Sequence, residues 1–89
     1  MMDKIREAMF HYNPISVADR ERRVRLVHPY CFIKGKDSVL LHCYPVSGYS
    51  SSPNPSGWRN LRVSDFALVQ VMPERFNVRP DLKMPKEIS

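Results

Sequence analysis

Apolar and polar residues follow a helical spacing only at the start of the chain. Between Met2 and Tyr12, apolar residues recur every three or four positions, and charged residues lie between them. Asn13-Pro14 then ends this pattern, because proline cannot continue a helix. We therefore expect one amphipathic helix over Met2 to Tyr12, with its apolar side covering a sheet.

From residue 15 onward the pattern changes to short apolar runs bounded by turn residues, which predicts strands. Alternation in Arg23-Val24-Arg25-Leu26-Val27 predicts that Val24 and Leu26 face the core. The run Ser38 to Tyr44 has sizeable groups on both faces, with Leu41 and Cys43 on one side and His42 and Tyr44 on the other, as in a central strand. The expected strands are Ile15 to Ala18, Arg22 to His28, Tyr30 to Lys34, Ser38 to Tyr44, Trp58 to Val63 and Phe66 to Met72.

These elements predict a mainly β fold of five or six short strands with one N-terminal α-helix, arranged as a small barrel or sandwich. Residues 1–72 form this domain. Residues 73–89 contain three prolines among charged and apolar residues, which excludes a helix and predicts an extended C-terminal arm. We expect this arm to pack along its own domain or along a partner.

Composition narrows the class of protein. Eighty-nine residues with 43% hydrophobic and 26% charged side chains suit one globular domain with a single small core. The apolar runs are too short to span a bilayer, and none follows the N-terminus, so we expect a soluble, cytoplasmic protein without membrane contact. Cys31 and Cys43 lack CxxC spacing and a paired histidine pattern, so we expect no metal and no cofactor. Buried free thiols are the favoured state for these cysteines, and a cross-strand disulfide is the alternative.

Positive charge gathers in one part of the chain. The net charge is +5, and residues 20–36 hold six basic residues and one acid, Glu21. Such an excess attracts phosphates. The alternative interpretation is a solvated strand face whose arginines point to water.

A long polar segment, residues 45–57, follows the strand predicted over residues 38–44 and leads into Trp58-Arg59. Its length predicts a binding loop.

The order of these features resembles that of a WYL domain over roughly residues 5–76. After the helix come Arg-Arg-Val-Arg-Leu-Val-His-Pro-Tyr (22–30), Ser-Val-Leu-Leu-His-Cys-Tyr (38–44) and Gly-Trp-Arg-Asn-Leu-Arg-Val-Ser-Asp-Phe (57–66). Where the family has its name-giving triplet this chain has Val39-Leu40-Leu41, so only the final leucine is kept. The resemblance implies a short, stand-alone, Sm-like or SH3-type β-barrel with a regulatory role in bacteria or phage. It also implies a basic groove for a nucleotide or nucleic acid, to which Tyr44, Arg59 and Arg62 contribute.

Chemistry points to the same residues, because the arginine fork matches phosphate oxygens and aromatic rings stack on bases. The candidate ligand-binding residues are Arg23, Arg25, His28, Tyr44, Tyr49, Ser50, Trp58, Arg59 and Arg62. Structural alternatives exist for several of them: Trp58 as a core residue, Arg62 as an ion-pair partner of Asp65, and His28 as a structural histidine.

Two functions follow from these candidates. The first is a non-enzymatic module that senses or binds a nucleotide or short single-stranded nucleic acid. The second is a protein-interaction module or small phage-type inhibitor, which docks onto a larger protein or forms homo-oligomers through the two-faced strand and the arm. An enzyme is the weakest hypothesis and no catalytic residue is expected, because adjacent residues such as His42 and Cys43 point to opposite faces of a strand.

Overall fold

The computed structural model describes residues 1–48 and 57–81, which form one helix and five strands. The elements are α1 (Met2–His11), β1 (Ile15–Asp19), β2 (Val24–Lys34), β3 (Val39–Gly48), β4 (Arg59–Arg62) and β5 (Phe66–Val71), with the short 3₁₀ turn η1 (Val63–Asp65) between β4 and β5. The predicted class, mainly β with one N-terminal helix, is confirmed.

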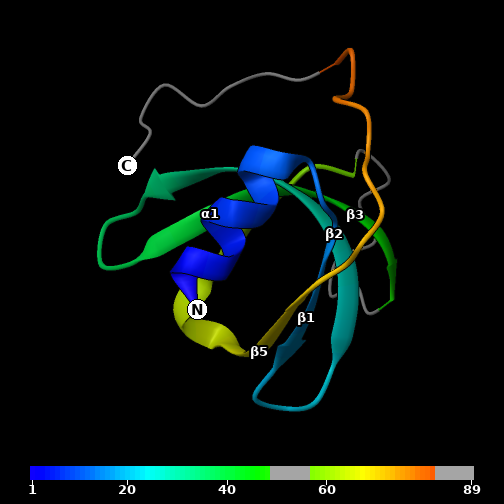
Figure 1. Ribbon diagram of the computed structural model, residues 1–89. Helices are drawn as coiled ribbons and strands as arrows, with labels where there is room; N and C mark the ends of the chain where they lie inside the picture. The colour runs from blue at the N-terminus through cyan, green and yellow to red at the C-terminus, as the bar shows by residue number, and fades with distance from the viewer. Residues whose placement is uncertain (49–56, 82–89) are drawn as a thin grey trace.

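All five strands belong to one antiparallel sheet in the order β4-β3-β2-β1-β5. The sheet curves strongly, and α1 lies over its hollow (Figure 1). No ladder joins β4 to β5 in the described part of the chain, so the sheet stays open between its two edge strands. No helix among the described residues is long and apolar enough to cross a membrane.

The core lies between α1 and the concave side of the sheet. Ile5 and Ala8 of α1 are fully buried against strand residues such as Ile15, Val27 and Leu41. This burial explains the helix, because its apolar positions fall on the one face that meets the sheet. Both cysteines are buried free thiols, as predicted.

Strand β2 differs from the prediction in continuity. It runs through Pro29 as one strand, where the sequence indicated a break into two. Pro29 is buried, and the register with β3 shifts between Pro29 and Cys31. An irregularity of this kind lets a strand accommodate a residue that has no backbone N–H, so the proline bends β2 without ending it.

Strand β2 also differs from the prediction in which of its alternating residues face the core. Arg25 pairs with the buried Val17, and cross-strand partners share a face, so Arg25 rather than Val24 lies on the core side. Val24 is 50% exposed, and the expectation that Val24 and Leu26 face the core was wrong. Alternation has two possible phases, and burial of Val27 selects the one opposite to that predicted.

The end of β3 and the segment after β5 also bear on the predicted loop and the predicted arm. Strand β3 continues to Gly48, so the first four residues of the loop predicted over residues 45–57 belong to this strand instead. Residues 49–56, which include Tyr49 and Ser50, lie outside the described residues. After β5 the chain continues in the same direction past β2 (orange in Figure 1), and we call residues 73–81 the C-terminal arm.

Candidate functional site

The predicted site residues separate onto two surfaces of the sheet. His28 and Tyr44 are cross-strand partners on the outer face, where Trp58 joins them. Arg25 and Arg59 pair with Val17 and Cys43 and therefore lie on the core side of their strands. The single basic and aromatic groove predicted from sequence thus becomes two candidate surfaces.

The first surface is a pocket of about 590 Å³ at the open side of the sheet, lined by residues of the turn between β1 and β2, edge strand β4 and the η1 region. Apolar residues contribute part of its lining: Val17, Leu40, Leu61 and Phe66. The polar lining comprises Asn60, four arginines and three acids: Arg20, Arg23, Arg25, Arg62, Asp19, Glu21 and Asp65. We call this feature the arginine-lined pocket.

Asp19 organises the turn at one side of this pocket. Its carboxylate accepts hydrogen bonds from the backbone N–H groups of Glu21 and Arg23, at 2.8 and 3.0 Å, and from Nε of Arg23 at 2.8 Å. Desolvation opposes ionisation of Asp19, but the hydrogen bonds from Arg23 and Glu21 outweigh it, so the pKa of Asp19 is lowered. Arg23, predicted as a ligand residue, is therefore engaged in holding this turn.

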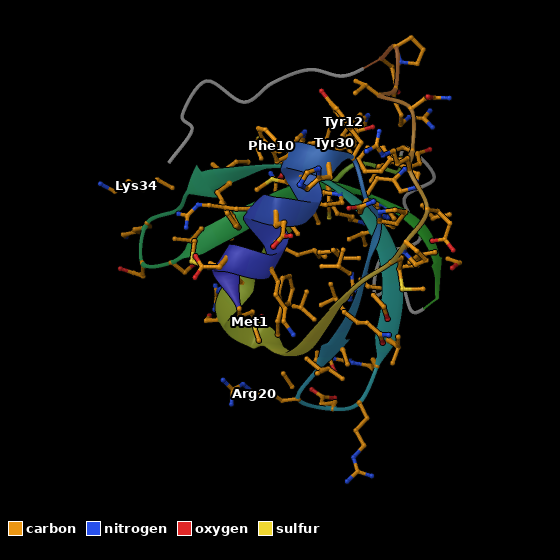
Figure 2. All side chains as sticks on the ribbon, viewed as in Figure 1. Met1, Phe10, Tyr12, Arg20, Tyr30 and Lys34 are labelled. Carbon is orange, nitrogen blue, oxygen red and sulfur yellow. The ribbon has the colours of Figure 1, made fainter. Side chains whose placement is uncertain are left out.

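The other arginines differ in their surroundings. Arg20 donates to the Ser64 carbonyl at 3.2 Å and is exposed at the β1–β2 turn, at the opposite end of the molecule from Tyr12 and Tyr30 (Figure 2). Arg62 is exposed on edge strand β4, and the alternative ion pair with Asp65 is not found within residues 57–81. Arg20 and Arg62 thus present charge at the rim of the pocket.

Arg25 and Arg59 also influence the buried Cys43. Burial raises the pKa of the Cys43 thiol to about 12, against the lowering effect of these two arginines. The thiol therefore stays protonated at neutral pH and is a poor nucleophile.

The second surface is a set of rings on the outer side of β2 and β3, which we call the aromatic face: His28, Tyr30, His42, Tyr44 and Trp58. The Trp58 ring stacks on His42 with centroids 4.9 Å apart and planes 4° apart. Tyr30 and Tyr44 meet Trp58 edge-on, at 5.0 and 5.3 Å. Trp58 is half-buried among these rings and does not belong to the core cluster. The alternative interpretation of Trp58 as a core residue is therefore wrong.

His42 and Tyr30 were not among the predicted site residues. Nδ1 of His42 lies 2.7 Å from Oδ1 of Asn60, which accepts a hydrogen bond from it. Nε2 of the same ring is buried without a hydrogen-bond partner in the described structure. Both residues could have been found from spacing, because Tyr30 follows His28 by two positions and His42 precedes Tyr44 by two, which places each pair on one strand face.

The C-terminal arm covers the aromatic face. The Phe76 ring stacks on His28 with centroids 4.2 Å apart, and the Arg79 guanidinium carbon lies 3.8 Å from the centre of the Tyr44 ring. Asp81 accepts a hydrogen bond from Trp58 Nε1 at 3.3 Å. The predicted packing of this arm along its own domain is observed for residues 73–81.

No family model, curated protein or solved structure matches this chain. No group of three or more potential metal-ligating side chains is found in residues 1–48 and 57–81. The two surfaces are therefore the features of the molecule that indicate its function.

Proposed function

We propose that the protein is a non-enzymatic module that binds a nucleotide-sized, phosphate-bearing ligand in the arginine-lined pocket. The observation that carries this proposal is the pairing of an apolar wall with exposed arginines at the rim. The volume of the pocket, about 590 Å³, falls within the roughly 300–1,000 Å³ typical of small-molecule sites.

Each part of the pocket suits one part of such a ligand. Arg20 and Arg62 present guanidinium groups, whose planar forks match phosphate oxygens. Leu61 and Phe66 offer apolar contact for a base or sugar. The ligand would therefore lie with its phosphate at the rim and its ring toward the apolar wall.

The charge balance selects among ligands. Asp19, Glu21 and Asp65 offset three of the four arginine charges in the lining, which leaves a modest positive excess. A long polyanion gains most from an uninterrupted basic surface, whereas one phosphate group needs only the nearest arginines. A nucleotide thus fits this pocket better than a short single-stranded nucleic acid. The resemblance to WYL domains and the regulatory role it implies remain predictions.

The test is a titration of the full chain with mononucleotides and cyclic nucleotides, followed by amide chemical shifts at low and at high salt. We expect Arg62→Ala to weaken binding about tenfold, which corresponds to about 1.4 kcal/mol. Arg75→Ala serves as the matched control, because it removes the same charge from the exposed arm outside the pocket.

Two results would reject this function. One is the absence of a saturable shift with any nucleotide at low salt. The other is equal weakening by Arg62→Ala and Arg75→Ala, which would show that net charge rather than the pocket governs binding. Tighter binding of short single strands with a steep salt dependence would instead favour nucleic acid as the ligand.

A protein-interaction module is the second candidate function. A specific observation favours it, because an extended peptide segment, the arm, is already seated on the aromatic face.

A further inference from the structure

We propose that the aromatic face is a docking site for an extended peptide that presents an arginine. The C-terminal arm occupies this site in cis, and an arginine-bearing segment of a partner protein displaces it. None of the five residues of the aromatic face lines the arginine-lined pocket, so the inference does not rest on nucleotide binding.

Arg79 shows what the site recognises. Its guanidinium carbon lies 3.8 Å above the Tyr44 ring centre, and its Nε donates to Asp81 Oδ1 at 2.9 Å. The backbone N–H of Arg79 donates to the Tyr30 hydroxyl at 3.1 Å, which places the residue over the rings. A planar guanidinium can stack on a ring and still donate hydrogen bonds at its edge, which an ammonium group does less well.

The residues on either side of Arg79 extend the recognised pattern. Phe76 lies flat on His28, and Asp81 accepts the Trp58 N–H. The arm between them is neither helix nor strand in the described structure, and it contains Pro80. The site therefore accommodates an extended segment with an aromatic residue three positions before the arginine and an acid two positions after it.

The charge of the face favours a cation over a phosphate. None of its five residues is lysine or arginine, and the Tyr44 ring directs its negative face toward the bound guanidinium of Arg79. Arg79, the cation over Tyr44, belongs to the arm and leaves with it. Once the arm has left, none of the five residues that form the face is an arginine or lysine that could neutralise a phosphate.

The arm is attached in a way that allows displacement. No residue from 73 to 81 belongs to the core cluster, and only Phe76 and Arg79 among them are half-buried. Its first turn is held by hydrogen bonds from Phe76 N to the Tyr12 carbonyl and from Asn13 Nδ2 to the Glu74 carbonyl. Segments with so little buried surface open before the rest of a domain. The covalent tether adds to the arm's contacts, because it supplies an effective concentration on the order of mM.

The experiment measures binding of a labelled peptide with the sequence of residues 73–81 to the full chain by fluorescence anisotropy. In the full chain, Arg79→Ala weakens the arm and vacates the face. We expect this variant to bind the peptide at least about tenfold more tightly than the unaltered chain. A chain carrying Arg75→Ala, a matched loss of charge, should bind like the unaltered chain.

Peptide variants test the recognition itself. A peptide with Arg79→Ala should lose binding to the vacated face, whereas one with Arg75→Ala should retain it. Tyr44→Leu added to the Arg79→Ala chain should abolish binding, because it removes the ring beneath the guanidinium. Far-ultraviolet circular dichroism checks that each chain keeps its sheet.

Several outcomes would overturn the proposal. These are equal peptide binding by the unaltered and Arg79→Ala chains, equal binding of the two peptide variants, or no binding at all. Loss of the folded sheet in the Arg79→Ala chain would show that the arm is an integral part of the fold. Dimers of the unaltered chain that exchange arms would assign the site to a second copy instead of a partner protein.

Discussion

The Phe76 ring lies flat on the His28 imidazole, with centroids 4.2 Å apart and planes inclined by 4°. This pair joins the C-terminal arm to the middle of strand β2. Because one member is a histidine, we expect docking of the arm to depend on the protonation state of His28.

Acidification should loosen the arm. Burial, and secondarily the positive charge of Arg79, lowers the pKa of His28 from its ordinary value of 6.5. The docked state therefore favours the neutral ring, and its stabilisation is present above pH 6.5 and falls as the pH drops through 6.5 toward the lowered pKa. We expect Trp58 fluorescence to report arm release between about pH 7 and about pH 5.

His28→Phe is the variant that tests this coupling, because it keeps a ring beneath Phe76 but cannot be protonated. Its arm should stay docked over the same pH range. His11→Gln serves as the control, because His11 is an exposed imidazole on α1 outside the aromatic face, and this variant should keep the pH response of the unaltered chain. An unchanged pH response in His28→Phe would show that a different group is responsible.

Asp19→Asn should destabilise the domain in a pH-dependent way. The lowered pKa of Asp19 means that its carboxylate stabilises the folded state above pH 3.8, and this contribution is lost as the pH falls through the lowered value. The variant should therefore have a lower Tm at neutral pH and approach the unaltered protein in strong acid. Asp37→Asn, in the exposed turn between β2 and β3, should leave the Tm unchanged. Equal effects of the two changes would rule out a special role for the Asp19 hydrogen bonds.

Gly57→Ala should reduce stability by about 1–3 kcal/mol, because Gly57 has a φ of +91°, which favours glycine. An added Cβ would also lie 2.5 Å from Cε2 of Tyr44. Urea unfolding measures the loss. Combining Gly57→Ala with Tyr44→Ala removes the clash and keeps the backbone strain, so the double variant should lose less than the two single changes added together. Strict additivity would contradict a close approach between these two positions.

Leu41→Ala should cost about 2–5 kcal/mol, since Leu41 is fully buried in the core cluster and its truncation leaves a cavity. Leu68→Ala is the matched control, because Leu68 is 61% exposed on β5 and its change should stay within about 0.5 kcal/mol. The difference in free energy of unfolding tests the assignment of the core. Similar losses for both leucines would mean that the outer side of β5 is covered by something else.

Local pattern was sufficient for the element types and for the faces of one strand. Helical spacing identified α1 within one residue, and side-chain alternation separated Leu41 and Cys43 on one face of β3 from His42 and Tyr44 on the other. These features depend on side-chain direction along a single segment, which repeats about every 3.6 residues in a helix and every two in a strand. A sequence contains that information directly.

Tertiary structure decided three things: which residues of β2 face the core, how the predicted site residues separate between two surfaces, and where the C-terminal arm lies. Alternation cannot distinguish whether Val24 or Arg25 points inward, because pairing with Val17 on another strand sets the phase. Arg25 and Arg59 lie on the core side of their strands whereas His28 and Tyr44 lie on the outer face, because pairing with Val17 and Cys43 sets the direction of each side chain. Phe76 reaches His28 only once the sheet has brought β2 and the end of β5 together, and no local pattern encodes a contact between such distant segments.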